Sequence, residues 1–172
     1  HRMLKQVMAI AMGFGLMFWG LELIGIGTHA LRDVHLFADF LKELKDNPFY
    51  AIMVTAAFTA LVHSSAVTIG FAMTLAISGQ ITLVDACYWV YGANIGTTAT
   101  PLMAAFGANF VGRQVAWAHC TYKLVSVVIF IPFTPYLAEL ISTSSLARDV
   151  ANFHTAFNLA AAAVFFSFIN IG

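Results

Sequence analysis

The sequence predicts an all-α polytopic membrane protein that contains a re-entrant helical hairpin and a broken transmembrane helix. Of its 172 residues, 60% are hydrophobic and 9% are charged, whereas a soluble domain carries charge on about a quarter of its residues. Long apolar runs alternate with short polar segments, and clusters of small polar residues interrupt two of these runs. The net charge is zero, so the composition argues against a nucleic-acid-binding surface.

The first two predicted elements are a membrane span over residues 7–27 and an interfacial helix over residues 35–46. The first run contains one charged residue, Glu22, and at about 1.5 Å per residue it is long enough to cross a hydrocarbon layer of about 30 Å. The second segment, LFADFLKELKD, places apolar residues at helical spacing on one face and charged residues on the other. Such a short amphipathic helix is expected to lie in the membrane interface.

Residues 48–78 are predicted to form a re-entrant hairpin. Asn47 and Pro48 have the residue types favoured at a helix start, and Lys, Arg, Asp and Glu are absent from 48–84. The polar residues His63-Ser64-Ser65 lie near the middle. Each arm is roughly 13–15 residues, which is short of the ~20 needed to span a bilayer. Two short arms that meet at a polar tip are tolerated where the tip is buried in protein or lines a wet cavity.

A broken helix is predicted over residues 81–106. One apolar arm ends near Tyr91, and the sequence GANIGTT follows before a second arm that contains Pro101. Two glycines spaced by four residues, an asparagine and paired threonines indicate an unwound segment over 92–98. Its carbonyl and hydroxyl groups are expected to face a ligand.

Two further spans are predicted over residues 115–137 and 150–171, and their beginnings are similar. RQVAWAHCTYKL, which starts at Arg113, aligns without gaps to RDVANFHTAFNL, which starts at Arg148. The match includes polar residues at equivalent depths, which favours a duplicated helix over chance. His119 and His154 coincide in this alignment, and we interpret them as packing and hydrogen-bonding residues, since no second metal ligand lies at a suitable spacing.

Two polar clusters at the predicted breaks are candidate binding groups. An unsatisfied polar group in a bilayer costs several kcal/mol, so clustered polar residues at a break favour function. Scattered threonines such as Thr55, Thr59 and Thr74 are instead expected to bond to their own helix. Helix N-termini and backbone N–H groups favour an anion, whereas carbonyl and hydroxyl oxygens favour a hard cation such as sodium. The candidates for substrate and ion binding are His63, Ser64, Ser65, Thr68, Gly92, Asn94, Gly96, Thr97 and Thr98.

The two clusters carry a family resemblance. TALVHSSAVTIG followed by GANIGTTATPLMAAFG resembles the type II sodium/phosphate cotransporter family, bacterial branch, whose members carry T-A-L-x-Q-S-S-S-A-T and G-A-N-I-G-T-T motifs in each of two inverted repeats. The GLEL run, the LKELKDNP segment and the A-x-x-H-x-x-[FY]-N helix starts are also similar to that family. The resemblance covers nearly the whole chain and is greater to the C-terminal repeat. It implies one repeat of an inverted-repeat transporter.

The resemblance implies a phosphate and sodium site held between hairpin tips and unwound helices, and this chain departs from the family at three positions. His63 stands where the family has Gln, Ala66 where it has the third Ser, and Lys123 where the helix motif usually has Asn. The loss of a hydroxyl at Ala66 removes one candidate contact. Lys123 and Asn158 are candidates for coupling or for a fixed charge, although snorkelling of Lys123 toward an interface is an equal alternative.

One hairpin motif and one GANIGTT segment make half of the site that the family uses. The expected partner, besides the lipid bilayer, is therefore a second inverted repeat, either in the same longer chain or in an antiparallel copy. The positive charges are distributed too evenly to decide the membrane orientation.

The function expected from these features is secondary transport of inorganic phosphate or a related oxyanion, coupled to sodium, in the inner membrane of a bacterial cell. The alternatives are a proton-coupled or uncoupled anion carrier, and a binding or regulatory membrane subunit that kept the fold without transport. Enzymatic catalysis and a resident cofactor or metal are not expected. Phosphate and sodium are expected as transported ligands.

Overall fold

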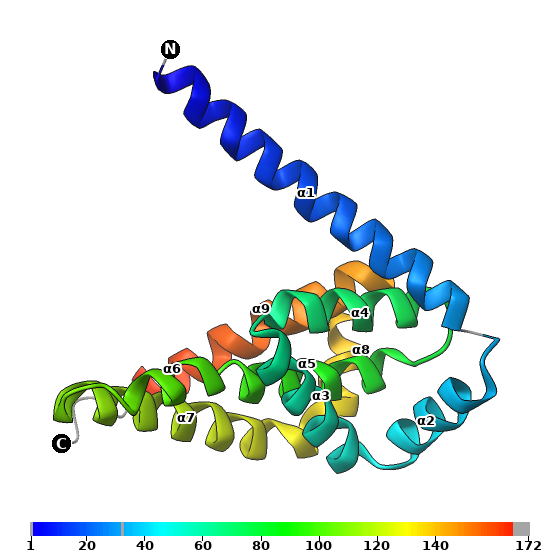
Figure 1. Ribbon diagram of the computed structural model, residues 1–172. Helices are drawn as coiled ribbons and strands as arrows, with labels where there is room; N and C mark the ends of the chain where they lie inside the picture. The colour runs from blue at the N-terminus through cyan, green and yellow to red at the C-terminus, as the bar shows by residue number, and fades with distance from the viewer. Residues whose placement is uncertain (1, 32, 167–172) are drawn as a thin grey trace.

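The computed structural model describes residues 2–31 and 33–166, and every regular element in these ranges is a helix. The first, α1 (Arg2–Leu31), projects away from the remaining helices, as Figure 1 shows. Its most apolar stretch has none of its residues buried. Where α1 meets the bundle it packs against α4, and Leu21 approaches Gly70. The predicted span 7–27 lies within this longer helix.

Helix α2 (His35–Asp46) occupies the residues predicted for the amphipathic helix. It buries Leu41 and Leu44 and leaves its charged residues exposed. Asn47 then caps the next helix, because its side chain accepts a hydrogen bond from the backbone N–H of Tyr50 (3.1 Å). Pro48 follows at the first helical position, where its missing N–H costs nothing.

The segment predicted as a hairpin forms two helices, α3 (Pro48–Val62) and α4 (Ser65–Ile77). They are separated at His63, which adopts a left-handed conformation (φ 54°, ψ 26°), and at the extended residue Ser64. A left-handed residue ends a helix and turns the chain. The break therefore falls at the polar residues from which it was predicted.

The predicted broken helix consists of α5 (Leu83–Gly96) and the short α6 (Ala99–Ala105). A capping box between Thr82 and Asp85 begins α5. The prediction that residues 92–98 are unwound is wrong for 92–96, which are helical. The interruption is confined to Thr97 and Thr98, whose backbone angles remain in the right-handed helical region.

The glycines of this segment serve close helix packing instead of unwinding. A Cβ atom at Gly92 would overlap Thr55 Oγ1 and lie 2.6 Å from the carbonyl oxygen of Ile52. A Cβ atom at Gly96 would overlap the carbonyl oxygen of Ala56. Two glycines four residues apart lie on one face of a helix, and here that face lies directly against α3.

The chain closes with an antiparallel pair of long helices. Helix α7 (Phe110–Phe130) continues through the 3-10 helix η1 (Ile131–Phe133) into α8 (Thr134–Ile141), and α9 (Leu146–Phe166) returns beside α7 (Figure 1). The change of helix type coincides with two prolines in the IPFTP sequence. Ring contacts of Tyr122 with Phe165 (4.8 Å) and of Phe130 with Phe157 (5.5 Å) define the antiparallel register.

Two helical stretches in the described part of the chain are long and apolar enough to cross a membrane, namely Arg2–Leu31 and Phe110–Ile141. The second contains the predicted span 115–137. Helix α9 contains the beginning of the predicted span 150–171 but also carries Arg148, Asp149 and several polar residues. Residues 167–171 of that prediction lie outside the described residues, so a third crossing stays a prediction.

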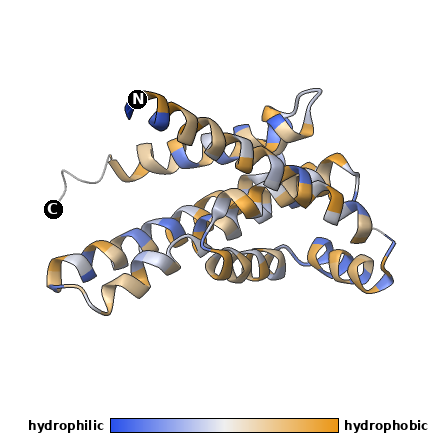
Figure 2. Ribbon diagram, turned by 45° about the horizontal axis from the view of Figure 1, so that its top comes forward, coloured by the Kyte–Doolittle hydropathy of each residue, from blue (hydrophilic) through white to orange (hydrophobic). Residues whose placement is uncertain are grey.

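Helix α5 lies at the centre of the bundle. It contacts α3, α4, α7, α8 and α9, and its residues from Ala86 onward are mostly buried. Tyr91 packs edge-on against Phe153 and Phe157 and donates or accepts a hydrogen bond with Thr134 (3.0 Å). Hydrophobic residues predominate along the helices (Figure 2), and many large ones are exposed at the outer surface. An apolar exterior around a packed interior is the pattern expected for a protein surrounded by lipid.

Candidate functional site

The ammonium group of Lys123 lies at the meeting point of three helices. Lys123 projects from α7, and its Nζ donates hydrogen bonds to Asn94 Oδ1 on α5 (2.8 Å) and Asn158 Oδ1 on α9 (2.5 Å). The Lys123 side chain is 9% exposed and Asn94 is 3% exposed. An ionisable residue buried within apolar helices is expensive to hold and marks a candidate functional site.

A cavity of about 430 Å³ adjoins this ammonium group. Hydroxyl, amide, imidazole and ammonium groups from α4, α7, α9 and the α5–α6 segment line it, and we call it the polar cavity after these groups, although carbon atoms make up most of its wall by area. The residues that line it are Ser65, Asn94, Thr97, His119, Lys123, His154, Thr155, Asn158 and Leu159. A cavity of this composition has the donors and positive charge that an oxyanion requires.

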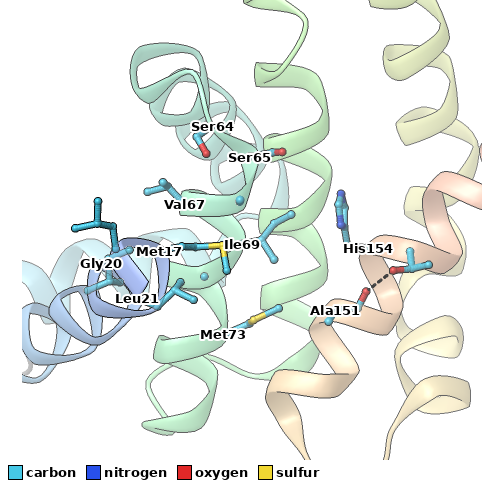
Figure 3. A pocket seen from close by; sticks show the side chains of 15 residues that line it. Met17, Gly20, Leu21, Ser64, Ser65, Val67, Ile69, Met73, Ala151 and His154 are labelled. Atoms are coloured by element: carbon cyan, nitrogen blue, oxygen red, sulfur yellow. Dashed lines mark hydrogen bonds between the residues drawn. The ribbon is translucent and has the colours of Figure 1, made fainter. Parts of the chain in front are cut away.

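A second cavity, of about 730 Å³, lies between α1, α4 and α9. Its wall is mostly apolar and includes Leu21, Ile69 and Met73 (Figure 3). Ser65, His154 and Thr155 line both cavities, so these residues stand at the boundary between the two spaces. The polar cavity is thus adjacent to an apolar one that reaches α1.

The beginning of α4 faces both cavities. Ser64 precedes this helix at the N-cap position, and its side chain makes no capping hydrogen bond. Figure 3 shows Ser64 and Ser65 together at this end of the helix. The first N–H groups of a helix lack partners within the helix and carry partial positive charge, so this end of α4 favours an anion.

The structure brings together five of the predicted site residues and separates the others. Ser65, Asn94, Thr97, Lys123 and Asn158 line the polar cavity, and Ser64 lines the apolar one. The remaining predicted residues line neither of these two cavities: His63, Thr68, Gly92, Gly96 and Thr98.

Structural contacts account for the residues outside the cavities. His63 Nδ1 shares a hydrogen bond with Thr100 Oγ1 (3.1 Å), which ties the α3–α4 break to α6. Thr68 is fully buried and shares a hydrogen bond with Thr59 Oγ1 (2.6 Å), which joins α3 to α4. Thr98 donates to the carbonyl oxygen of Ile95 (2.7 Å).

The expectation for the scattered threonines is confirmed. Thr55 donates to the carbonyl oxygen of Ala51 (2.7 Å), Thr59 to that of Thr55 (2.7 Å) and Thr74 to that of Gly70 (2.9 Å). Each of these bonds lies within one helix and removes the cost of a buried hydroxyl.

Sequence reasoning missed the two histidines of the polar cavity. His119 and His154, which the sequence predicts to be packing and hydrogen-bonding residues, both line the cavity. The available signal was the alignment of the last two helices, which pairs His119 with His154 and Lys123 with Asn158 at the same offset of 35 residues. Residues four apart share a helix face, so each helix contributes an equivalent pair to one site.

Comparison with known proteins gives one family. The family described as "Na+/Pi-cotransporter" matches residues 32–170. The "Uncharacterized protein YqeW" of Bacillus subtilis is 30% identical over 172 residues, which cover 98% of this chain and 55% of the relative. The "Putative inorganic phosphate export protein YjbB" of Escherichia coli K12 is 28% identical over 167 residues, which cover 96% of this chain and 31% of the relative.

The "Putative inorganic phosphate export protein YjbB" of Salmonella typhimurium is 27% identical over 156 residues, which cover 90% of this chain and 29% of the relative. The chain thus spans about half or less of the length of these relatives. No solved structure matches it. Because the family match extends over most of the chain and includes both polar clusters and the Lys123 helix, the chain belongs to the Na+/Pi-cotransporter family.

Proposed function

We propose that this chain forms half of a membrane transport site for inorganic phosphate and that transport is coupled to sodium. The observation that carries the proposal is the Lys123 ammonium, held by Asn94 and Asn158 beside a polar cavity. Family membership and the phosphate-export names of the Escherichia coli and Salmonella relatives support phosphate as the substrate. The family description supports sodium as the coupling ion.

The geometry favours an anion at the polar cavity for two independent reasons. The ammonium is partnered by two neutral amides among the described residues, so its positive charge is not cancelled there. The beginning of α4 adds partial positive charge from Ser64 and Ser65. Hydroxyl and imidazole groups of Thr97, His119 and His154 supply further hydrogen-bond partners.

The proposed position in the membrane follows from the helix breaks. The α3–α4 segment would form a re-entrant hairpin, and the interruption between α5 and α6 would lie at similar depth within the bilayer. A second repeat, in the same longer chain or in an antiparallel copy, would complete the site. We place the assembly in the inner membrane of a bacterial cell, since the relatives compared are bacterial.

Phosphate flux in liposomes tests the proposal. The full-length protein that contains this sequence is reconstituted, and flux of radiolabelled phosphate is compared in sodium chloride and choline chloride. We expect flux that requires sodium. Equal flux in the two salts would remove sodium coupling and favour the proton-coupled or uncoupled carrier. Absence of flux together with phosphate-dependent thermal stabilisation would favour a binding subunit.

A matched pair of histidine variants tests the location of the site. The His154 side chain makes no hydrogen bond to a described residue, so its removal leaves the helix contacts in place. We expect His154→Ala to raise the KM for phosphate about tenfold, as the loss of one hydrogen bond to a charged ligand does. His29→Ala, on an exposed residue of α1, is the control and leaves KM unchanged. Equal effects of the two variants would place the phosphate elsewhere.

A further inference from the structure

The Lys123 ammonium occupies a position with the ligands of a cation site. Two oxygen atoms approach Nζ from different helices, Asn94 Oδ1 from α5 and Asn158 Oδ1 from α9. Both are neutral amide oxygens, which are the hard ligands that alkali and alkaline-earth cations take in proteins. The Tyr122 ring lies on the same group, with its centroid 5.3 Å from Nζ, and an aromatic face attracts a cation.

The two amide oxygens are held in place by the opposite ends of their own side chains. Asn94 Nδ2 donates to the carbonyl oxygen of Val90 (2.9 Å), and Asn158 Nδ2 donates to that of His154 (2.7 Å). Each bond runs back one turn along the same helix, so each amide is fixed with its oxygen directed at Nζ. The two oxygens are therefore expected to stay in position for another cation when the lysine is replaced.

The alignment of the two last helices places an amide at the position equivalent to the lysine. Lys123 and Asn158 coincide at the offset of 35 residues, and they are also in direct contact. The lysine thus introduces a positive charge at the position whose equivalent in α9 carries an amide.

We propose that the Lys123 ammonium takes the place of one bound sodium ion between Asn94 and Asn158, so that this protein carries one cation of its transport site covalently. The inference rests on the proposed function, since it concerns the same phosphate site. Two of the three N–H donors of the ammonium are used by the asparagines, which leaves one for the anion in the adjacent cavity.

We therefore expect this protein to need fewer sodium ions for each phosphate than it would if sodium occupied the position of the ammonium. A sodium ion that binds together with phosphate must leave water and be supplied with each transport cycle, whereas the ammonium is always present. The charge also fixes the local electrostatics, because a single positive charge held in a low-dielectric site attracts an oxyanion whether or not sodium is present.

Replacement of the lysine by a neutral amide tests this role. In Lys123→Asn the ammonium is lost, and a third amide oxygen joins the two that remain. We expect the Hill coefficient for sodium activation of phosphate flux to rise by about one, and the sodium concentration needed for half-maximal flux to rise about tenfold. Lys123→Gln, which is closer to lysine in length, carries the same expectation.

Lys45→Asn is the matched control, because it removes the same charge from an exposed residue of α2, whose Nζ donates one hydrogen bond within the described residues, to the Gln80 carbonyl oxygen (3.4 Å). It leaves the sodium dependence of flux unchanged. An unchanged sodium dependence in folded Lys123→Asn and Lys123→Gln would overturn the inference, and so would an equal change in Lys45→Asn.

Thermal unfolding keeps the inference testable if the protein does not transport phosphate. We expect sodium chloride, compared with choline chloride at equal ionic strength, to raise the midpoint of Lys123→Asn by about 3 °C or more beyond the rise that it causes in the wild type. A variant that is unfolded in choline chloride is expected to fold in sodium chloride. Failure of sodium to stabilise or restore both variants beyond its effect on the wild type would refute the cation role, whereas absence of phosphate flux in the wild type would refute the proposed function alone.

Discussion

Lys123 and Asp149 are the two charged side chains that the described structure buries, and the protein satisfies them differently. Lys123 has two amide partners from other helices and borders a cavity. Asp149 is fully buried in the first turn of α9 and accepts hydrogen bonds from Thr143 Oγ1 (2.6 Å) and the Thr143 N–H (3.0 Å). The carboxylate therefore ties the α8–α9 connection to the helix, while the ammonium remains available to a ligand.

Asp149 is expected to contribute to stability and not to phosphate binding. Asp149→Ala leaves two donors of Thr143 without their acceptor and removes a negative charge from a helix N-terminus, which costs about 2–4 kcal/mol together. Asp149→Asn keeps one acceptor oxygen, so we expect it to lower the free energy of unfolding by less than Asp149→Ala does. Thermal or denaturant unfolding of the purified protein measures both. A melting midpoint of Asp149→Ala equal to that of the wild type would contradict this role.

At the scale of the elements, the glycine pair of α5 decides how closely α3 and α5 approach. Gly96 lies against the backbone of Ala56 and the side chain of Thr59, and Gly92 lies against Ile52 and Thr55. The same close approach brings the Thr59–Thr68 hydrogen bond and the α3–α4 break beside α5 and α6. The glycines thus position the beginning of α4 near the cavity without contributing ligand atoms.

This packing role predicts a large effect of one methyl group. Gly96→Ala forces α3 and α5 apart, because the new Cβ atom meets a backbone carbonyl that cannot rotate away, and we expect a loss of about 1–3 kcal/mol. Gly25→Ala on α1 is the matched control, since nothing lies within 4 Å of its Cβ position. It is expected to leave stability unchanged or to raise it by up to about 1 kcal/mol, through helix propensity. Equal unfolding midpoints of the two variants would contradict close packing at Gly96.

At the scale of the whole molecule, large apolar surfaces remain without a protein partner in the described structure. Helix α1 stands apart from the bundle, and Leu61 near the α3–α4 break and Phe106 at the end of α6 are 80% and 91% exposed. Lipid covers part of such a surface. The second repeat that we propose would cover the rest.

The native protein is therefore expected to contain a second repeat. We expect the intact mass of the native polypeptide to be about twice the 18.6 kDa of this chain, as an inverted repeat in one chain requires. An 18.6 kDa polypeptide that crosslinks as an antiparallel dimer would instead assign the second repeat to another copy. An 18.6 kDa monomer that binds phosphate in detergent would contradict the requirement for a partner.

Predictions from sequence were most accurate where local chemistry decides the outcome. The apolar run of α1, the amphipathic pattern of α2 and the Asn47-Pro48 start of α3 each depend on neighbouring residues. The break at His63-Ser64 also has a local cause, since polar residues and a left-handed conformation interrupt a helix wherever the helix packs. The back-bonded threonines follow the same logic, because their acceptors lie one turn away.

Predictions failed where the deciding contact comes from another helix. The pattern GANIG permits either unwinding or close packing, and α3 decides for packing by approaching Gly92 and Gly96. The position of His119 and His154 at the cavity, which the sequence analysis did not predict, depends on which faces of α7 and α9 meet, and this is set by the antiparallel register of those helices. Periodicity defines the face of one helix but not the partner of that face.

The sequence by itself determined that this is a helical protein for an apolar solvent, with two polar interruptions and a family resemblance in their motifs. The tertiary structure alone decided that Lys123 does not snorkel toward an interface but lies between Asn94 and Asn158. Snorkelling and inward burial use the same flexible side chain, so composition does not distinguish them. Two amide oxygens fixed on neighbouring helices compensate the desolvation of the ammonium, and their positions exist only once the helices have packed.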